Sequence, residues 1–414
     1  MGQGASDGSD PKTTNKDTFM SLNYFSAERI LSPQGQWLKQ TVLAFDEEGQ
    51  LVDIISSEDV DPVNVRFYSG ALIPGFVNAH CHLELSHMKS LLPTGTGLIP
   101  FIKGVVTRRE AQEEIIQDAI QMAESEMIQN GIQAVGDISN VTDTFVQKAK
   151  GNLRYHTFVE AFDFMQEHTS EETFEKALQV YDDLFLPKGH KKSITPHAPY
   201  SVSPGLLQKI ASFNESHSSV SIHNQESWHE QALFLQKGGD LLPFFESFGL
   251  DFSHFEATER NSIHHIIDHF YHGGKVLFVH NTLSTKEDIS AAEQWNEDIY
   301  WVSCPNANLY IENQLPKYDV FLESGAKLAL GTDSLASNWQ LSIFEEMKTI
   351  KKYQSSVPSL QLIEWGTRNG AEALGFEDEL GSLEISKRPG LIHLDLMEHH
   401  NYEIQQDTLM TRLL

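Results

Sequence analysis

Short apolar runs alternate with longer helical patterns over most of the chain. From residue 73 onward, buried strand-like runs are followed by stretches such as 111–130, where Ala119, Ala123 and Met127 recur at helical spacing. Eight strands are predicted, at 72–79, 134–138, 155–159, 193–196, 220–222, 275–279, 299–303 and 327–330. Eight βα repeats predict an α/β fold of the (β/α)₈ TIM-barrel type, in which functional groups lie at the carboxyl ends of the strands.

The two ends of the chain have a different pattern. Residues 18–72 contain short alternating segments, such as 41–45 and 51–55, separated by turn residues, and strand-like runs return at 391–396. We therefore expect 18–72 and 377–414 to form one small discontinuous β-sandwich domain beside a barrel of residues 73–376. The first 17 residues are rich in Gly, Ser and Asp and are predicted to be a disordered tail.

The composition of the chain excludes some classes of partner and location. The 414 residues carry a formal net charge of −28, from 30 Lys and Arg against 58 Asp and Glu. Such a balance argues against nucleic acid and against an anionic membrane surface as partners. Cys81 and Cys304 are the only cysteines, and no apolar run approaches the length of a membrane span. With no signal-peptide pattern at the N-terminus, we expect a cytoplasmic enzyme.

His80-Cys81-His82 follows the first predicted barrel strand. Residues i and i+2 of a strand share a face, so His80 and His82 can direct two imidazoles at one point while Cys81 points away. Converging neutral imidazoles suit a divalent metal, above all zinc. An isolated pair of this kind is a weak signal in a chain with 19 histidines.

Further polar residues lie at the ends of other predicted strands. They are His197 after strand four, His223 and Glu226 after strand five, His280 after strand six, Cys304 and Asn308 after strand seven, and Asp333, Ser334 and Asn338 after strand eight. One such residue would be ordinary, but a set of them at the same end of a barrel is hard to obtain by chance.

These residue types suit one hydrolytic mechanism. Three nitrogens and one oxygen are enough to hold one divalent ion and leave a position for water; they come from His80, His82, His223 and Asp333. Zinc is the expected metal, with iron or manganese as substitutes, and it would lower the pKa of water toward neutrality. Glu226 can shuttle protons if burial raises its pKa. His280 can stabilise developing charge, and Asp333 can accept a proton from the water.

The chain resembles the amidohydrolase superfamily, in particular its mononuclear deaminase and chlorohydrolase branch, which includes aminodeoxyfutalosine and S-adenosylhomocysteine deaminases. The matching stretches are PGFVNAHCH at 74–82, PHAPYS at 196–201, HNQE at 223–226, GTDS at 331–334 and NGAEALG at 369–375. The resemblance extends over nearly the whole chain from about residue 20. Lys191 and Lys192 precede strand four and no lysine ends it, so a single metal is expected rather than two bridged by a carbamylated lysine.

The resemblance also implies residue roles. It matches the four metal ligands named above and makes Glu226 and His280 the catalytic pair. The substrate-binding positions that it implies are Glu84, His197, Asn308 and Ser334. For Glu84, a plain role in the first turn of the following loop is an equal alternative. Ala307 replaces the serine that usually precedes the asparagine matched by Asn308.

Three functions remain open from the sequence. The first is hydrolytic deamination of an amino-substituted nitrogen heterocycle or adenosine-like nucleoside, with release of ammonia, and Glu84 favours it. The second is hydrolysis of a cyclic amide or amidine, as in imidazolonepropionase. The third is a catalytically inactive scaffold, which predicts an eroded site, whereas every ligand and acid–base position is present here. A homodimer is an expectation from the family alone.

Overall fold

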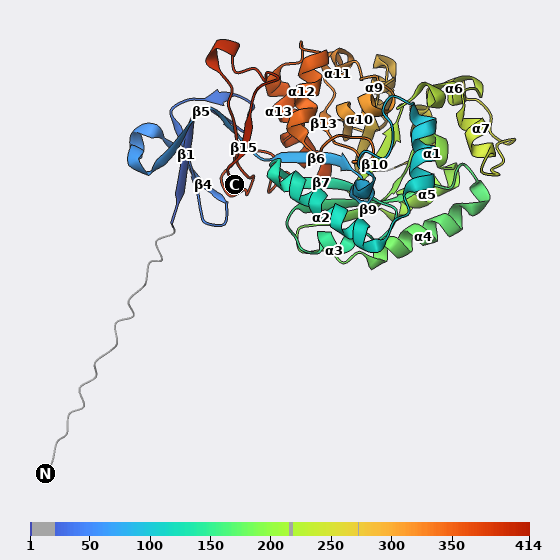
Figure 1. Cartoon of the computed structure of the whole chain (residues 1–414), viewed down its shortest axis with the longest axis horizontal. Helices are drawn as coiled ribbons and strands as arrows, with labels where there is room; N and C mark the ends of the chain where they lie inside the picture. Colours follow the sequence, from blue (N-terminus) through green and yellow to red (C-terminus); the bar gives the residue numbers. More distant parts are fainter. Residues whose placement is uncertain (2–20, 215–217, 272) are drawn as a thin grey trace.

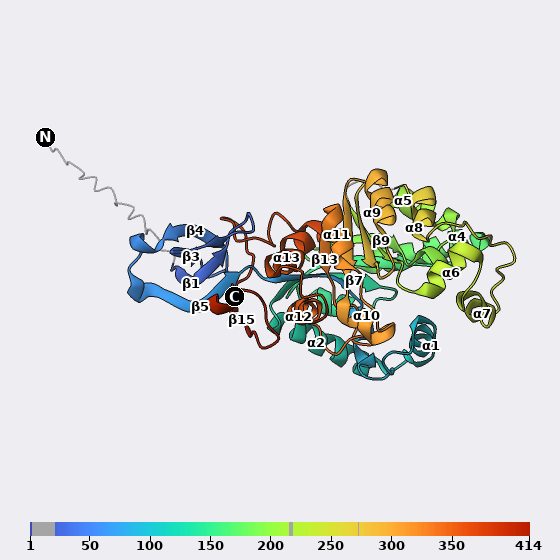
Figure 2. The same ribbon diagram turned by 90° about the horizontal axis from the view of Figure 1, so that it is seen from above.

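The computed structural model describes residues 1, 21–214, 218–271 and 273–414. A small sheet formed by both ends of the chain lies beside a larger body of strands and helices (Figures 1 and 2). Except for Met1, the tail predicted at 1–17 lies outside the described residues.

Eight parallel strands form the centre of the larger body. They pair in two four-stranded sheets, ordered β6-β7-β8-β9 and β10-β11-β12-β13. Their bounds are β6 Phe76–Cys81, β7 Ile132–Ser139, β8 Arg154–Ala161, β9 Lys191–Pro196, β10 Ser219–Asn224, β11 Lys275–His280, β12 Ile299–Ser303 and β13 Leu328–Leu330. Backbone hydrogen bonds join the two sheets at both edges. The His223 amide donates to the His197 carbonyl at 2.9 Å, and the Thr332 amide donates to the His80 carbonyl at 3.0 Å.

Helices follow most of these strands. The helices are α1 Leu98–Arg108, α2 Glu113–Gln129, α3 Phe145–Lys148, α4 Ser170–Asp183, α5 Pro204–Phe213, α6 Trp228–Gln236, α7 Leu241–Glu246, α8 Ile263–His269, α9 Lys286–Trp295, α10 Pro305–Ile311, α11 Tyr318–Ser324, α12 Ile343–Tyr353, α13 Ser359–Trp365 and α14 Arg368–Leu374. Helix α2 corresponds to the pattern at 111–130. Within the described ranges, no helix has the length and apolar character needed to cross a bilayer.

The strand predicted at 72–79 is wrong as one element. Strand β5, Val65–Ile73, ends in the small sheet, and β6 starts at Phe76 in the large body. Pro74 between them has no amide hydrogen for a strand ladder. Gly75 lies so close to its neighbours that a Cβ there would be 2.8 Å from the Pro389 carbonyl oxygen. The chain therefore passes from one sheet to the other at this dipeptide.

Strands from both chain ends share the small sheet, whose order is β15-β14-β5-β1-β3-β4 with β2 paired to β1. The remaining bounds are β1 Asn23–Leu31, β2 Trp37–Leu38, β3 Thr41–Phe45, β4 Leu51–Ser56, β14 Ile392–Leu394 and β15 Met410–Arg412. Strand β14 runs antiparallel to β5, with Ile392 opposite Ile73. The described strands here form one sheet, so the second layer of a sandwich stays a prediction, as do the domain boundaries.

Ile392 joins the small sheet to the larger body. Its side chain is fully buried and belongs to the same core cluster as Ile73 and Phe76. It lies against Gly131, just before β7, where a Cβ would come within 2.6 Å of the Ile392 Cδ1 atom.

We predict that Ile392→Ala lowers the free energy of unfolding by about 2–5 kcal/mol, because it leaves a cavity at this junction. Denaturant unfolding followed by circular dichroism measures the change. Thr411→Ala, on exposed β15, is the control and should stay within about 0.5 kcal/mol of the wild type. Equal effects of the two substitutions would contradict the proposed junction.

Candidate active site

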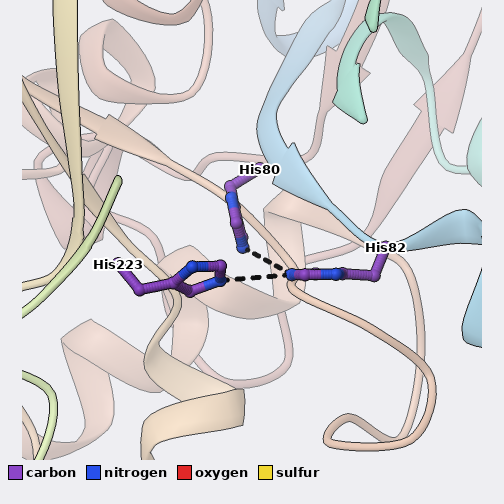
Figure 3. Close-up of side chains that lie close together, drawn as sticks. All are labelled: His80, His82 and His223. Carbon is purple, nitrogen blue, oxygen red and sulfur yellow. Dashed lines mark hydrogen bonds between the residues drawn. The ribbon is translucent and has the colours of Figure 1, made fainter. Parts of the chain in front are cut away.

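Three histidine side chains converge where β6 and β10 end. His82 Nε2 lies 3.2 Å from His80 Nε2 and 3.3 Å from His223 Nε2, and Figure 3 shows the three rings directed at one another. Asp333, which follows β13, places Oδ1 at 3.6 Å from His82 Nε2 and 3.8 Å from His80 Nε2. The structure therefore brings together all four residues that the sequence predicts as ligands.

The spacing of these atoms fits one divalent metal. Ligands about 2.0–2.1 Å from a tetrahedral zinc lie about 3.3 Å from one another. Burial lowers the pKa of His82 and of His223 to about 3, with the neighbouring imidazoles acting in the same direction. Burial also lowers the pKa of His80 well below its ordinary value. All three rings are thus neutral near pH 7, the form in which imidazole binds a metal.

Hydrogen bonds orient the predicted ligand side chains. His223 Nδ1 donates to the His197 carbonyl at 2.9 Å, which leaves Nε2 available to bind a metal. Asp333 has a φ of +57°, an uncommon backbone conformation for a residue other than glycine. Its amide donates to the His80 carbonyl at 3.0 Å, and its Oδ2 accepts from Ser337 Oγ at 2.7 Å. The Asp333 carboxylate is therefore held facing the histidines.

A buried ion pair fixes the backbone next to His82. The side chains of Asp137 and Lys148 are fully buried, with Lys148 Nζ 2.5 Å from Asp137 Oδ2. The other carboxylate oxygen accepts the Leu83 amide at 2.8 Å, directly after His82. Sequence reasoning missed this pair, although an aspartate inside the apolar strand predicted at 134–138 was a visible signal.

The backbone beside Glu226 is fixed by the start of helix α6. Ser227 is the N-cap residue of this helix, and its hydroxyl accepts the Glu230 amide. In return, the Glu230 carboxylate accepts the amides of Gln225 and Glu226, each at 3.0 Å. These bonds hold Glu226 at the mouth of β10, three residues after His223.

The Glu226 carboxyl group lies in an environment that favours its neutral form. Tyr200 donates its hydroxyl to Oε1 at 2.5 Å, and Oε2 lies 3.7 Å from His280 Nε2. Burial raises the pKa of Glu226 to about 8, against the opposing effect of the hydrogen bond from Tyr200, and the negative charge of Asp333 adds to the upward shift. Burial therefore favours the protonated form of this group, which is the form that can donate a proton.

His280 is positioned by its backbone and by Asn308. Its φ is +74°, and its Nδ1 donates to Asn308 Oδ1 at 2.8 Å, so Nε2 faces the cavity. Asn308 itself is not among the residues that line the cavity. The structure thus places it behind His280, and its predicted role in substrate binding stays a prediction.

The histidines open into a cavity of about 500 Å³, a size typical of small-molecule sites. The predicted residues that line it are His82, His197, His223, Glu226, His280, Asp333 and Ser334. Its other walls are largely apolar; they include Leu98, Phe101 and Ile102 of α1, Phe162 and Phe164 after β8, and Phe244 and Phe245 of α7. A polar end that can carry out chemistry thus adjoins a broad apolar end.

Glu84 lies behind the wall of this cavity. Its Oε1 is 3.1 Å from Arg109, and its Oε2 accepts the amides of Asn140 at 2.9 Å and Val141 at 3.3 Å. Burial raises the pKa of Glu84 to about 7, against the opposing effect of Arg109. Both oxygens have protein partners and the residue does not line the cavity, so its contact with a substrate stays a prediction.

Glu160 and Tyr200 are among the cavity residues that sequence reasoning missed. Glu160 directly follows the strand predicted at 155–159, so the rule that identified His223 and His280 would have found it. Tyr200 lies inside the stretch at 196–201, but nothing in the sequence indicates that its hydroxyl reaches Glu226.

Comparison with known proteins agrees with this architecture. An adenosine deaminase of Helicobacter pylori is 28% identical over 330 residues, 78% of this chain and 79% of that protein. An aminodeoxyfutalosine deaminase of Nitratiruptor sp. is 25% identical over 396 residues, 89% of this chain and 90% of that protein. The solved structure of Helicobacter pylori aminofutalosine deaminase with methylthio-coformycin has the same fold, with a TM-score of 0.73 at 24% identity, over 89% of this chain and 91% of that chain. Residues 71–411 match the model of the amidohydrolase family, and the chain therefore belongs to that family.

Proposed function

We propose that this protein deaminates an amino-substituted nitrogen heterocycle by hydrolysis, with an adenosine-like nucleoside as substrate and ammonia as product. The relatives named as adenosine and aminodeoxyfutalosine deaminases support this substrate class. The observation that carries the proposal is the placement of the buried Glu226 carboxyl group, which lines the same cavity as the converging histidines and lies 3.7 Å from His280 Nε2.

The proposed metal ligands are His80, His82, His223 and Asp333. One divalent ion, zinc with iron or manganese as substitutes, would activate water for attack on the substrate carbon that bears the amino group. Their spacing and the neutral state of the three imidazoles support this assignment.

The proton transfers are then assigned to side chains of the chain itself. Glu226 gives its proton to the ring nitrogen next to the carbon under attack, which makes that carbon more electrophilic. Asp333 accepts one proton of the attacking water and passes it to the amino group, so the C–N bond breaks and ammonia leaves. The remaining hydroxyl proton returns to Glu226 as the product carbonyl forms, which restores both side chains. His280 Nε2, which faces the cavity, stabilises the charge that develops on the incoming oxygen.

Substrate contacts are proposed for the residues that line the cavity beside this centre. His197 and Ser334 can hydrogen-bond the heterocycle. Glu84 would act on the substrate through Arg109, and Asn308 would act through His280. The apolar end of the cavity suits a substrate with an uncharged extension.

The closure of the barrel, the small domain, the cellular location and the oligomeric state are also proposals. We infer that the two four-stranded sheets close into one (β/α)₈ barrel, which the contacts of β9 with β10 and of β13 with β6 support. A small domain from both ends of the chain is supported by the pairing of β14 with β5. The two free, buried cysteines fit a reducing cytoplasm, and a homodimer remains an expectation from the family.

A substrate panel tests the proposed reaction. Zinc-loaded protein is incubated with adenosine-type nucleosides, free aminopurines, pterins and cytosine, and ammonia release is followed. Turnover of a nucleoside is the expected result. Ring opening of a cyclic amide without ammonia release would favour the imidazolonepropionase type of reaction instead.

The first prediction for this site concerns the metal. Purified protein reconstituted with zinc should hold about one equivalent, and Asp333→Asn should lower the affinity and nearly abolish turnover, because a charged ligand and a proton acceptor are lost together. Elemental analysis and activity measure the two effects. Asp407→Asn, at an exposed position, removes the same charge and should change neither. Two tightly bound metals, or none, would refute the assignment.

The second prediction concerns the proton donor. Glu226→Gln keeps the size of the side chain but cannot deliver a proton, so kcat should fall by at least about 10²-fold while zinc content stays near one equivalent. Steady-state kinetics on the best substrate measures this, with exposed Glu297→Gln as the control. Near-normal turnover by Glu226→Gln would reject the mechanism.

A further inference from the structure

We propose that Glu160 determines substrate specificity, because its free carboxylate oxygen accepts a hydrogen bond from a donor group on the substrate. This inference rests on the proposed deamination and assigns a contact within the same cavity. Glu160 lies near the carboxyl end of β8, and its side chain is 3% exposed. It also lines the cavity beside His223 and His197.

The two oxygens of Glu160 have different surroundings. Oε2 accepts from Asn140 Nδ2 at 2.9 Å. Oε1 is buried and has no hydrogen-bond partner among the described residues. His223 Nδ1 lies 3.5 Å from Oε1, but its hydrogen is directed to the His197 carbonyl at 2.9 Å. Oε1 is thus a buried acceptor beside His223 that lacks a hydrogen-bond partner among the described residues.

An unpaired buried acceptor favours a ligand that brings a donor. Leaving such a group unsatisfied costs more than the ordinary gain from one hydrogen bond, and an analogue without the donor is therefore rejected strongly. An adenosine-like substrate carries two kinds of hydrogen-bond donor. One is a sugar hydroxyl group, and the other is an N–H group of the heterocycle.

Hydrogen bonds along the cavity wall give Glu160 and Glu84 different roles. Glu84 pairs with Arg109 and accepts the backbone amide of Asn140, whose side chain in turn holds Glu160. Glu84 is therefore a positioning residue that fixes Asn140, and Asn140 in turn fixes Glu160. Glu160 is the residue whose unpaired Oε1 remains for the substrate.

A second metal is the competing interpretation of this corner. Ligand atoms of Glu160, His197 and His223 lie within 4.8 Å of one another. However, His223 Nδ1 donates its hydrogen to a carbonyl, and His197 Nδ1 lies 2.7 Å from Ser201 Oγ. These bonds favour a substrate contact, and metal content decides between the two.

Glu160→Gln replaces the acceptor at the position of Oε1 with a donor. Since Asn140 Nδ2 requires an acceptor, the amide oxygen of the new side chain should take the place of Oε2, and its NH₂ group should face the cavity. The variant and the wild type are loaded with zinc and compared on adenosine, 2′-deoxyadenosine, 3′-deoxyadenosine and adenine, by kcat/KM and by equilibrium binding.

If the donor is a sugar hydroxyl, the wild type should prefer adenosine over the analogue that lacks it by about 10- to 100-fold, and the variant should reduce that preference to within about threefold. Adenine should then be unaffected. If the donor belongs to the heterocycle, the variant should raise KM by a similar factor for all four compounds, adenine included. Glu160→Asp, which keeps the acceptor but retracts it, should show a smaller change in the same direction.

Glu84→Gln is the matched comparison, since it alters a carboxylate of the same wall without changing the group that faces the substrate. It should weaken all four compounds by a similar factor and keep the wild-type preference among them. If Glu160→Gln has the kinetics and binding of the wild type on every compound, the inference is overturned and the deaminase proposal stands. The inference is also overturned if the wild type holds a second equivalent of zinc that Glu160→Gln loses. A wild type that neither binds nor deaminates any compound of the substrate panel would overturn both.

Discussion

The close approach of three imidazole nitrogens is the constraint on which the rest of the site depends. His80, His82 and His223 direct their Nε2 lone pairs at one point, with His82 only 3.2 and 3.3 Å from the other two. Burial keeps these rings uncharged, so no ionic repulsion separates them, and a divalent cation would turn the clustered lone pairs into ligand bonds. Parallel strands, which direct their carboxyl ends to the same edge, make this convergence possible.

Support for this cluster comes from groups behind it. The Asp137–Lys148 pair holds the backbone after His82, and the His197 carbonyl fixes the ring of His223. Positive φ angles at His280 and Asp333 turn the chain sharply where the side chains of these two candidate catalytic residues enter the cavity. Such conformations are costly for residues other than glycine and persist where surrounding contacts impose them, which is common at functional sites.

Much of this arrangement was predictable because strands and their ends follow simple periodicities. The alternation of side chains along β6 placed His80 and His82 on one face, and the strand-end rule brought in His223 and Asp333 from distant parts of the chain. The prediction at 72–79 failed because hydrophobicity alone does not show that Pro74 and Gly75 divide two sheets. The interpretation of Glu84 stayed open for a similar reason, since its partners Arg109 and Asn140 are distant in sequence and only the folded chain brings them together.

X-ray absorption spectroscopy of the zinc-loaded protein tests the proposed ligand set, because it reports the type, number and distance of the atoms around the metal. We expect nitrogen and oxygen neighbours only, at about 2.0–2.2 Å, with multiple-scattering features from three imidazoles. Cys81 and Cys304 are the only cysteines, and both are buried. A zinc–sulfur distance near 2.3 Å, fewer than three imidazoles, or a neighbouring metal would contradict it.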